Sequence, residues 1–228
     1  MIQIEMNTHT ELFAKIGLSY PYNEYRATWK MGGQPLVQRL HDKSHDWEDL
    51  RKLIPHMLLE GIMGYPFSCP DMIGGGQFTS FLNDAPIDEE LVVRSTQVHA
   101  LMPMMQFSVA PWRILDERHF NAVLDAVNLR DKFKETILTL AEKASVSGEP
   151  IVRSMEYVYP HKGYVDITDQ FMLGNYILVA PFLSKGEGSR KVILPKGKWK
   201  SDTGKIYKGG KPITINVPLT RLPYFIFQ

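Results

Sequence analysis

One strand–helix–strand unit constrains the fold of this chain more than any other feature of its sequence. Residues 37–40 and 65–69 are short and strand-like, and Asp42 and Asp71 follow them near turns. Between the two segments, apolar residues recur at helical spacing over residues 50–62. A unit of about thirty residues with a single crossover helix favours two parallel strands.

Strands and helices continue to alternate on both sides of this unit. We expect an earlier strand at 28–32, helices at 89–101 and 119–145, and a further strand at 149–155. This alternation predicts an α/β domain over residues 1–164. From residue 165 onwards, short apolar segments alternate with Gly, Pro and Lys turns without a helical period. That pattern predicts a small all-β domain, a β-sandwich, over residues 165–228.

Length and composition fit a folded protein with a core and argue against several classes of partner and site. The chain has 228 residues, 44% of them hydrophobic, which is enough for one large core or two smaller ones. The net charge of +1 argues against nucleic acid or an anionic membrane as a partner. We find no apolar run of the length of a membrane span and no signal peptide. Cys69 is the single cysteine, so no disulfide within the chain and no cysteine-rich metal site is expected.

The segment "RLHDKSHDW", residues 39–47, concentrates titratable groups and allows three interpretations. A metal site is disfavoured, because His41 and His45 on an extended strand end would lie about 13 Å apart. No other cluster is spaced to complete a ligand set, so we expect neither a metal nor a cofactor. For His45, Asp46 and the acidic residues after it, the start of a helix explains the pattern better.

Asp42 differs from its neighbours, because it lies where a strand of the predicted parallel sheet ends. In parallel α/β barrels the carboxyl ends of the strands carry the chemistry. Asp71 holds the equivalent place one unit later, so the pair suits acid/base catalysis or the binding of sugar hydroxyls. A helix cap or a surface salt bridge remains an alternative for Asp42. Of the four tryptophans, Trp112 is the candidate for the rim of a pocket.

Neither a phosphate-binding loop nor a serine or cysteine nucleophile is indicated by the sequence. The "GGG" run at 74–76 lacks the spacing of a phosphate-binding loop and reads as a flexible loop over the site. No GxSxG motif is present, and Cys69 lies in no environment that would lower its pKa. A serine or cysteine nucleophile is therefore not supported.

Several stretches together resemble glycoside hydrolase family 31. "HDKSHDWEDLRKLIPHMLLEGIMGYPFSCPDMIGG" is similar to the acid/base segment of that family, in which a tryptophan follows the catalytic aspartate by five residues. "EPIVRSM" resembles the last barrel strand, and "DQFMLGNYILVAP" and "LPKGKWKSDTGKIYKGG" resemble the adjoining β-domain. The resemblance implies the C-terminal half of a (β/α)8 TIM barrel followed by a small all-β sandwich domain.

Within the family, "GYPFSCPDMIGG" and "MPMMQFSVAPWR" look most like the branch that includes the myogenesis-regulating glycosidase. That branch implies a retaining hydrolase of α-galactosides, with α-glucosides or α-xylosides as the alternative. Two departures from the usual family pattern make ordinary α-glucosidase specificity doubtful. His41 and Lys43 replace the glycine and asparagine that flank the acid/base, and Gln106, Phe107 and Ser108 replace an Arg-Asn-His run.

Carried over residue by residue, the resemblance makes Asp42 the general acid/base. Arg26 resembles the arginine that reaches the sugar and the carboxylates, and Asp71 the aspartate that binds sugar hydroxyls. This assignment replaces the pairing of Asp42 with Asp71 as the two catalytic groups. The expected substrate contacts are Arg26, Asp71, Gln106, Ser108 and Trp112.

A retaining enzyme also needs a nucleophilic carboxylate about 5 Å from the acid/base. Upstream of Asp42 only Glu5, Glu11 and Glu24 are acidic, and none lies in the family's nucleophile context. A barrel typically takes about 250 residues, so roughly four strands fit here. We therefore expect the C-terminal part of a longer enzyme, inactive alone, whose partners are a carbohydrate and either the missing half or a second copy. A non-catalytic sugar-binding chain is the alternative. The compartment is unknown, with the cytoplasm as the default.

Overall fold

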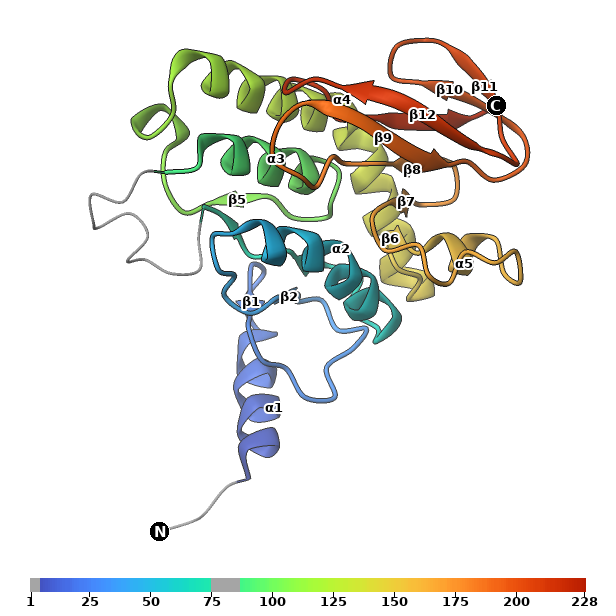
Figure 1. Cartoon of the computed structure of the whole chain (residues 1–228). Coiled ribbons are helices and arrows are strands. Elements are labelled where there is room, and N and C mark those ends of the chain that lie inside the picture. Colours follow the sequence, from blue (N-terminus) through green and yellow to red (C-terminus); the bar gives the residue numbers. More distant parts are fainter. Residues whose placement is uncertain (1–4, 75–86) are drawn as a thin grey trace.

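The computed structural model describes residues 5–74 and 87–228. The first part of the chain alternates helices and short strands (Figure 1). In chain order the elements are α1 (Met6–Gly17), β1 (Glu24–Tyr25), β2 (Val37–Arg39), α2 (Trp47–Ile62), β3 (Ser68–Cys69), β4 (Met72–Ile73), α3 (Glu89–Ala100), β5 (Gln106–Phe107), the 3-10 helix η2 (Pro111–Arg113) and α4 (Glu117–Ser147).

The strands of this first part pair in parallel, as the strand–helix–strand unit predicted. β1, β2 and β3 form one sheet, in which Gln38 of β2 stands opposite Tyr25 of β1 and Ser68 of β3. β4 and β5 form a second parallel pair. The predicted strand at 28–32 is wrong, because the strand of this region is β1 at 24–25. Residues 31–34 turn instead, with the amide of Gln34 donating to the carbonyl of Met31 at 3.2 Å.

The helices begin where side-chain caps allow them to begin. An aspartate precedes α2, α3 and α4, and its carboxylate accepts the backbone N–H three residues on, at 2.8, 3.2 and 2.8 Å respectively. α4 ends at Gly148, whose φ of 73° is the left-handed conformation that closes many helices. The three helices expected from sequence are confirmed. α1 was not expected from the sequence. In the structure its apolar residues are largely exposed to solvent.

The second part of the chain is rich in antiparallel strands. Its elements are β6 (Val152–Arg153), α5 (Met155–Val158), β7 (Phe171–Leu173), β8 (Ile177–Val179), β9 (Gly188–Ile193), β10 (Lys198–Ser201), β11 (Ile206–Lys208), β12 (Pro212–Val217) and β13 (Tyr224–Phe227). A six-stranded sheet has the order β11-β10-β13-β8-β7-β6, and β12 pairs with β9 in a second sheet. Val192 and Val217 of the second sheet share a buried cluster with Trp199 and Phe225 of the first.

β6 corrects one expectation. It pairs antiparallel with β7, Val152 standing opposite Leu173, so it belongs to the six-stranded sheet. The expectation that "EPIVRSM" forms the last parallel barrel strand is wrong. The antiparallel sheet therefore begins at β6. The sequence analysis placed the domain boundary later, at residue 165.

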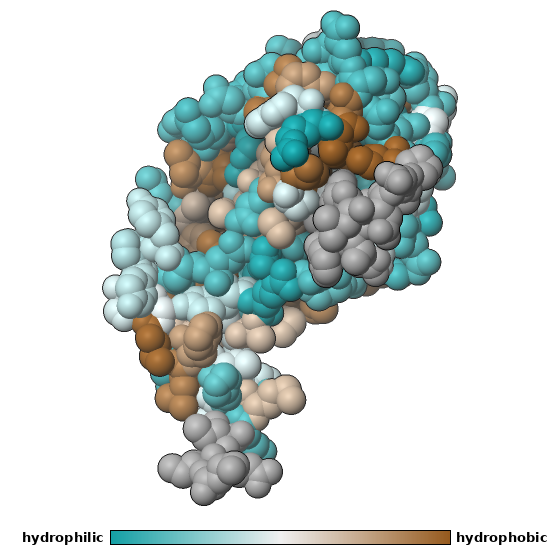
Figure 2. Space-filling model, turned by 90° about the vertical axis from the view of Figure 1, so that its left-hand side faces the viewer, coloured by the Kyte–Doolittle hydropathy of each residue, from teal (hydrophilic) through white to brown (hydrophobic). Residues whose placement is uncertain are grey.

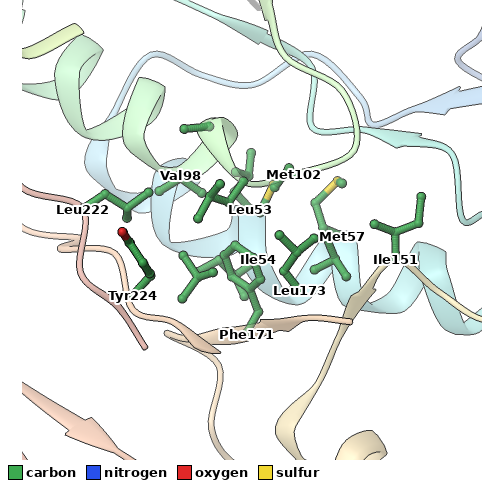
Figure 3. Close-up of a cluster of buried hydrophobic side chains, with 14 of the residues drawn as sticks. Leu53, Ile54, Met57, Val98, Met102, Ile151, Phe171, Leu173, Leu222 and Tyr224 are labelled. Atoms are coloured by element: carbon green, nitrogen blue, oxygen red, sulfur yellow. The ribbon is translucent and has the colours of Figure 1, made fainter. Parts of the chain in front are cut away.

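One apolar core joins the two parts of the chain. Figure 3 shows side chains of α2 and α3 pointing towards side chains of the six-stranded sheet. The labelled members are Leu53, Ile54, Met57, Val98, Met102, Ile151, Phe171, Leu173, Leu222 and Tyr224. Burial of this apolar surface holds the sheet against the helices that flank the parallel strands.

Apolar surface also remains open to solvent. α1 extends from the body of the molecule, and brown patches lie on the narrow lower part in Figure 2. Its exposed apolar side chains are Met6, Leu12, Phe13 and Ile16. Within the described residues, no helix combines the length and the apolarity needed to cross a membrane.

Candidate active site

An ion pair between Arg26 and Asp42 marks the carboxyl ends of two adjacent parallel strands. Arg26 directly follows β1, and Asp42 follows β2 by three residues. Nη1 of Arg26 lies 2.5 Å from Oδ1 of Asp42, and both side chains are about half exposed, at 48% and 45%. The hydrogen bond that Arg26 donates to Asp42 raises the pKa of Arg26, and the charges of Asp42, Asp71 and Glu24 raise it further. One guanidinium thus lies in the field of three carboxylates.

Buried polar contacts fix the backbone that carries Arg26. The amide nitrogen of Gln38, on β2, donates to the carbonyl of Arg26 at 2.9 Å, and its oxygen accepts from Thr28 Oγ1 at 2.6 Å. The hydroxyl of Tyr65 donates to the carbonyl of Thr28 at 2.9 Å. The position of Arg26 is therefore set by the sheet as well as by its own ion pair.

Asp71, whose charge acts on Arg26, is completely buried. Its backbone has a φ of 68°, a conformation that aspartate tolerates better than most residues. Oδ2 accepts the backbone N–H of Lys43 at 3.2 Å, and Oδ1 lies 4.0 Å from Nη1 of Arg39. Through Lys43, Asp71 holds the segment that begins with Asp42. Direct contact between Asp71 and a sugar stays a prediction.

A buried pair next to Asp42 was not found from the sequence. Nζ of Lys43 lies 3.0 Å from Nε2 of His99, which comes from α3. Burial lowers the pKa of Lys43 to about 8. Burial also lowers the pKa of His99 well below its usual value, with the charges of Lys43 and Arg130 adding to the effect. At neutral pH His99 is therefore uncharged and accepts a hydrogen bond from the ammonium group.

The remaining expected substrate contacts divide into two sets. Gln106, at the start of β5, donates to Oε2 of Glu24 at 2.8 Å, and Oε1 of Glu24 lies 3.2 Å from Nε of Arg39. Gln106 is thus tied to the strand that leads to Arg26. Ser108 instead donates to the carbonyl of Ile73 at 3.1 Å, and Trp112, on η2, is 70% exposed. None of the hydrogen bonds and ion pairs among the described residues joins Ser108 or Trp112 to Asp42.

Asp46 and the acidic residues after it form the start of α2, as predicted. Asp46 is the N-cap, and Oδ2 of Asp49 accepts the N–H of Ser44 at 2.6 Å. Glu48 pairs with Lys52 at 2.6 Å on the exposed face. These contacts account for the acidic residues after Asp42 without a ligand. Of the glycine run at 74–76, only Gly74 falls within the described residues, so the loop expected there is outside them.

Two other features lie outside the Asp42 cluster, the buried thiol of Cys69 and a carboxylate–histidine group that the sequence analysis did not expect. Burial raises the pKa of the Cys69 thiol to about 12, so this residue is a poor nucleophile. Glu89, Asp116 and His119 lie close enough together to bind a metal ion. Their hydrogen bonds explain the grouping, however, because Asp116 caps α4 and its own N–H donates to Glu89.

A large apolar groove lies on the opposite side of the parallel strands. Its volume is about 570 Å³, and residues that precede β1, β2, β3 and β5 line it, among them Tyr22, Leu36, Phe67 and Met104. Asp42 follows its strand, so the groove is at the other end of the sheet. Parallel α/β folds place their chemistry at the carboxyl ends of strands, so the groove lies at the end of the sheet away from the candidate site.

Known proteins resemble both parts of the chain. The model of the glycosyl hydrolases family 31 TIM-barrel domain matches residues 14–140, and that of the family 31 C-terminal domain matches residues 148–228. The myogenesis-regulating glycosidase of Mus musculus is 37% identical over 197 residues, which is 82% of this chain and 28% of the mouse protein. The α-glucosidase of Saccharolobus solfataricus is 35% identical over 213 residues, covering 81% of this chain and 30% of its own length.

A solved structure supports the same comparison. The family 31 α-xylosidase from a soil metagenome, complexed with xylose, superposes with a TM-score of 0.81 at 25% identity. The match covers 91% of this chain and 34% of the xylosidase. The chain therefore spans about a third or less of the length of each of these relatives. Along the chain, the match to the barrel domain comes first and the match to the C-terminal domain follows it.

Proposed function

The chain belongs to glycoside hydrolase family 31, and from that premise we propose that Asp42 is the general acid/base of a retaining α-glycosidase. The ion pair between Arg26 and Asp42 carries the proposal. It stands at the carboxyl ends of parallel strands, where such folds bind substrate. Asp42 is accessible enough to protonate a leaving glycosidic oxygen and then to deprotonate water.

We assign the other residues by what they contact. Arg26 orients Asp42 and reaches the sugar. Asp71 and Lys43 set the loop that carries Asp42, and Gln106 is held by Glu24 at the neighbouring strand. Ser108 and Trp112 would contact the sugar from the segment after β5. In this assignment β1 to β5 make up the C-terminal half of a (β/α)8 barrel, followed by a β-sandwich.

The nucleophile is proposed to come from a segment outside this chain. A retaining enzyme places its two carboxyl groups about 5 to 5.5 Å apart, facing the sugar. Of the described carboxylates in the field of Arg26, Asp71 is completely buried and Glu24 is bonded to Arg39 and Gln106. Neither is free to attack a sugar carbon. We therefore expect this chain to contribute the acid/base half of the site.

The favoured substrate class is a terminal α-galactoside. The residues that flank the acid/base and the Gln106–Ser108 segment depart from the pattern of α-glucosidases, and the sequence resembles a branch of the family that implies α-galactosides. An α-glucoside or α-xyloside is the second candidate, supported by the S. solfataricus α-glucosidase and the metagenomic α-xylosidase. Binding of sugar without catalysis is the third.

A chimera tests the proposal directly. Residues 14–228 would replace the matching C-terminal segment of the S. solfataricus α-glucosidase, so that the preceding barrel strands are supplied. The measurement is kcat/KM on aryl α-galactoside, α-glucoside and α-xyloside. Asp42→Asn should lower it by about 10²- to 10⁴-fold for a poor leaving group, and less for a dinitrophenyl leaving group, which needs no protonation. Asp46→Asn is the matched control, because asparagine also caps a helix.

Each outcome separates the alternatives. Preference for the galactoside would support the favoured class, and preference for glucoside or xyloside would select the second. An active chimera that tolerates Asp42→Asn would rule out Asp42 as the acid/base. The 228-residue chain alone should show no turnover. Turnover that Asp42→Asn abolishes would place a nucleophile within this chain and contradict that part of the proposal.

A further inference from the structure

A groove with aromatic walls lies on the six-stranded sheet, and none of its lining residues belongs to the Asp42 cluster. It forms where α5, β6, the turn between β7 and β8, and the end of β13 meet, at the side of the molecule where Figure 1 shows α5 next to β6 and β7. Tyr157, Tyr159 and Tyr176 line it, and its volume is about 390 Å³. That size is typical of sites for small molecules. We call it the tyrosine groove.

A buried arginine organises the polar wall of the tyrosine groove. Arg153 is 8% exposed and donates through Nε to the carbonyl of Pro150 at 2.7 Å. Nη1 donates to Oδ1 of Asn175 at 2.5 Å, and Nη2 lies 2.6 Å from Oε2 of Glu149. Because the arginine engages the amide oxygen, the NH2 group of Asn175 remains to donate. The second carboxylate oxygen of Glu149, a residue half exposed, remains to accept.

The aromatic wall combines exposure with a fixed backbone. Tyr176 is 65% exposed and Tyr157 is 43% exposed. The turn that carries Tyr176 is anchored at both sides. Gly174 donates to the carbonyl of Ile151 at 2.9 Å, and Phe227 donates to the carbonyl of Tyr176 at 2.9 Å. The ring of Tyr176 is therefore open to solvent on an anchored turn, where a ligand in the groove can contact it.

We propose that the tyrosine groove binds a pyranose unit of a glycan, separately from the Asp42 site. A pyranose has an apolar C–H face, which matches the exposed ring of Tyr176, while the ring of Tyr157 already packs against the guanidinium of Arg153 at 5.6 Å. The pyranose hydroxyls both donate and accept, which matches the Asn175 amide and the Glu149 carboxylate held side by side by Arg153.

A proline-rich peptide is the competing ligand for exposed tyrosines. Such a segment presents carbonyl acceptors, and its prolines carry no N–H donors. The free oxygen of Glu149 would then face few donors, whereas a sugar hydroxyl can donate to it. The donor and acceptor pair therefore favours the glycan.

Calorimetric titration of the 228-residue chain tests the inference, with isomaltotriose, maltotriose and raffinose as probes. Tyr176→Ala and Asn175→Ala should each weaken the binding of at least one probe by about tenfold. Tyr176→Phe should retain it, because the ring face is kept. Tyr20→Ala removes a similarly exposed tyrosine outside the groove and should change nothing. Asp42→Asn should also leave this binding intact, whether or not the chimera shows that Asp42 is catalytic.

Three results would overturn the inference. They are no binding of any probe, binding that Tyr176→Ala spares while Asp42→Asn abolishes it, and binding of a proline-rich peptide through Tyr176 in place of the sugars. If the Tyr176→Ala protein showed no thermal unfolding transition and so did not fold, the effect of Asn175→Ala on sugar binding would decide, because Asn175 is exposed and polar. The inference survives if the acid/base assignment fails, since its variants and readout are independent of turnover.

Discussion

The ammonium of Lys43 donates to Nε2 of His99 at 3.0 Å, and both side chains are buried next to the loop that carries Asp42. His99 leaves Nδ1 without a hydrogen-bond partner among the described residues. The negative charges that act on Lys43 in its titration range come from Asp71 and Asp49. They only partly offset its burial, so the pKa of Lys43 falls to about 8.

This shift predicts a stability that rises with pH in the alkaline range. Below pH 8 Lys43 is charged in both the folded and the unfolded chain, and the full cost of its burial is present. Between about pH 8 and 10.5 the folded chain has lost the proton while the unfolded chain still holds it. The free energy of unfolding therefore increases across this range, by up to about 3 kcal/mol from this group.

The substitution Lys43→Met measures the cost of burying the Lys43 ammonium in the free energy of unfolding. The variant should be more stable than the parent chain at pH 7 by about 2 kcal/mol, after about 1 kcal/mol for the lost hydrogen bond to His99. The difference should shrink towards pH 10. Urea denaturation of both proteins at pH 7 and pH 9.5 measures it. A difference that does not change with pH would mean that Lys43 is not buried as an ammonium.

Asp71→Asn should shift this alkaline range downwards. The negative charge of Asp71 raises the pKa of Lys43, so removing it lowers that pKa below 8. Asparagine keeps the shape of the side chain and tolerates the φ of 68°. The rise of stability should therefore begin at lower pH than in the parent chain. Asp131→Asn, at an exposed position, is the control and should leave the profile unchanged.

The parts of this structure that follow from local rules were predictable, and the parts that depend on distant partners were not. Helical periodicity located α2, α3 and α4, and the N-cap was expected only for α2. The two-residue strand β1 has too few residues to show alternation, and "TWKMG" offered a more strand-like composition nearby. Residues 150–152 are apolar in the manner of a barrel strand, and only the pairing of β6 with β7 reveals its sheet.

The same distinction applies to the candidate site. Asp42 and Arg26 could be named because strand ends and a family pattern mark them. Lys43 and His99 are 56 positions apart, and nothing local to either residue indicates the other. The burial of Asp71 likewise depends on Lys43 and Arg39 folding over it. Contacts that bring together side chains from separate elements need the three-dimensional arrangement.

The single cysteine should be inert in the folded chain. Cys69 is completely buried, and burial, with a smaller effect from Glu24, raises its pKa to about 12. A disulfide reagent such as Ellman's should not react with it at pH 8, and should react with one equivalent in urea. Ser145→Cys adds an exposed thiol on α4 as a positive control. Rapid labelling of the native parent chain would contradict the buried placement of Cys69.

Arg94 should be the residue most sensitive to a conservative change at the junction of the two parts of the chain. It is fully buried on α3, and its guanidinium lies over the ring of Phe182 at 5.0 Å. Nη1 donates to the carbonyl of Pro218 at 3.2 Å, and Nη2 to that of Gly186 at 3.4 Å. Lysine cannot reach both loops with one ammonium, so at least one buried carbonyl would lose its donor.

Arg94→Lys should therefore lower the free energy of unfolding by about 2 to 4 kcal/mol. Arg118→Lys is the matched control, because Arg118 is 67% exposed and its pair with Glu187 lies on the surface. That change should cost less than about 0.5 kcal/mol. Urea denaturation of the two variants gives the comparison. Equal effects would mean that the C-terminal sheet is held by the apolar core of α2 and β7 alone, with no share for the Arg94 contacts.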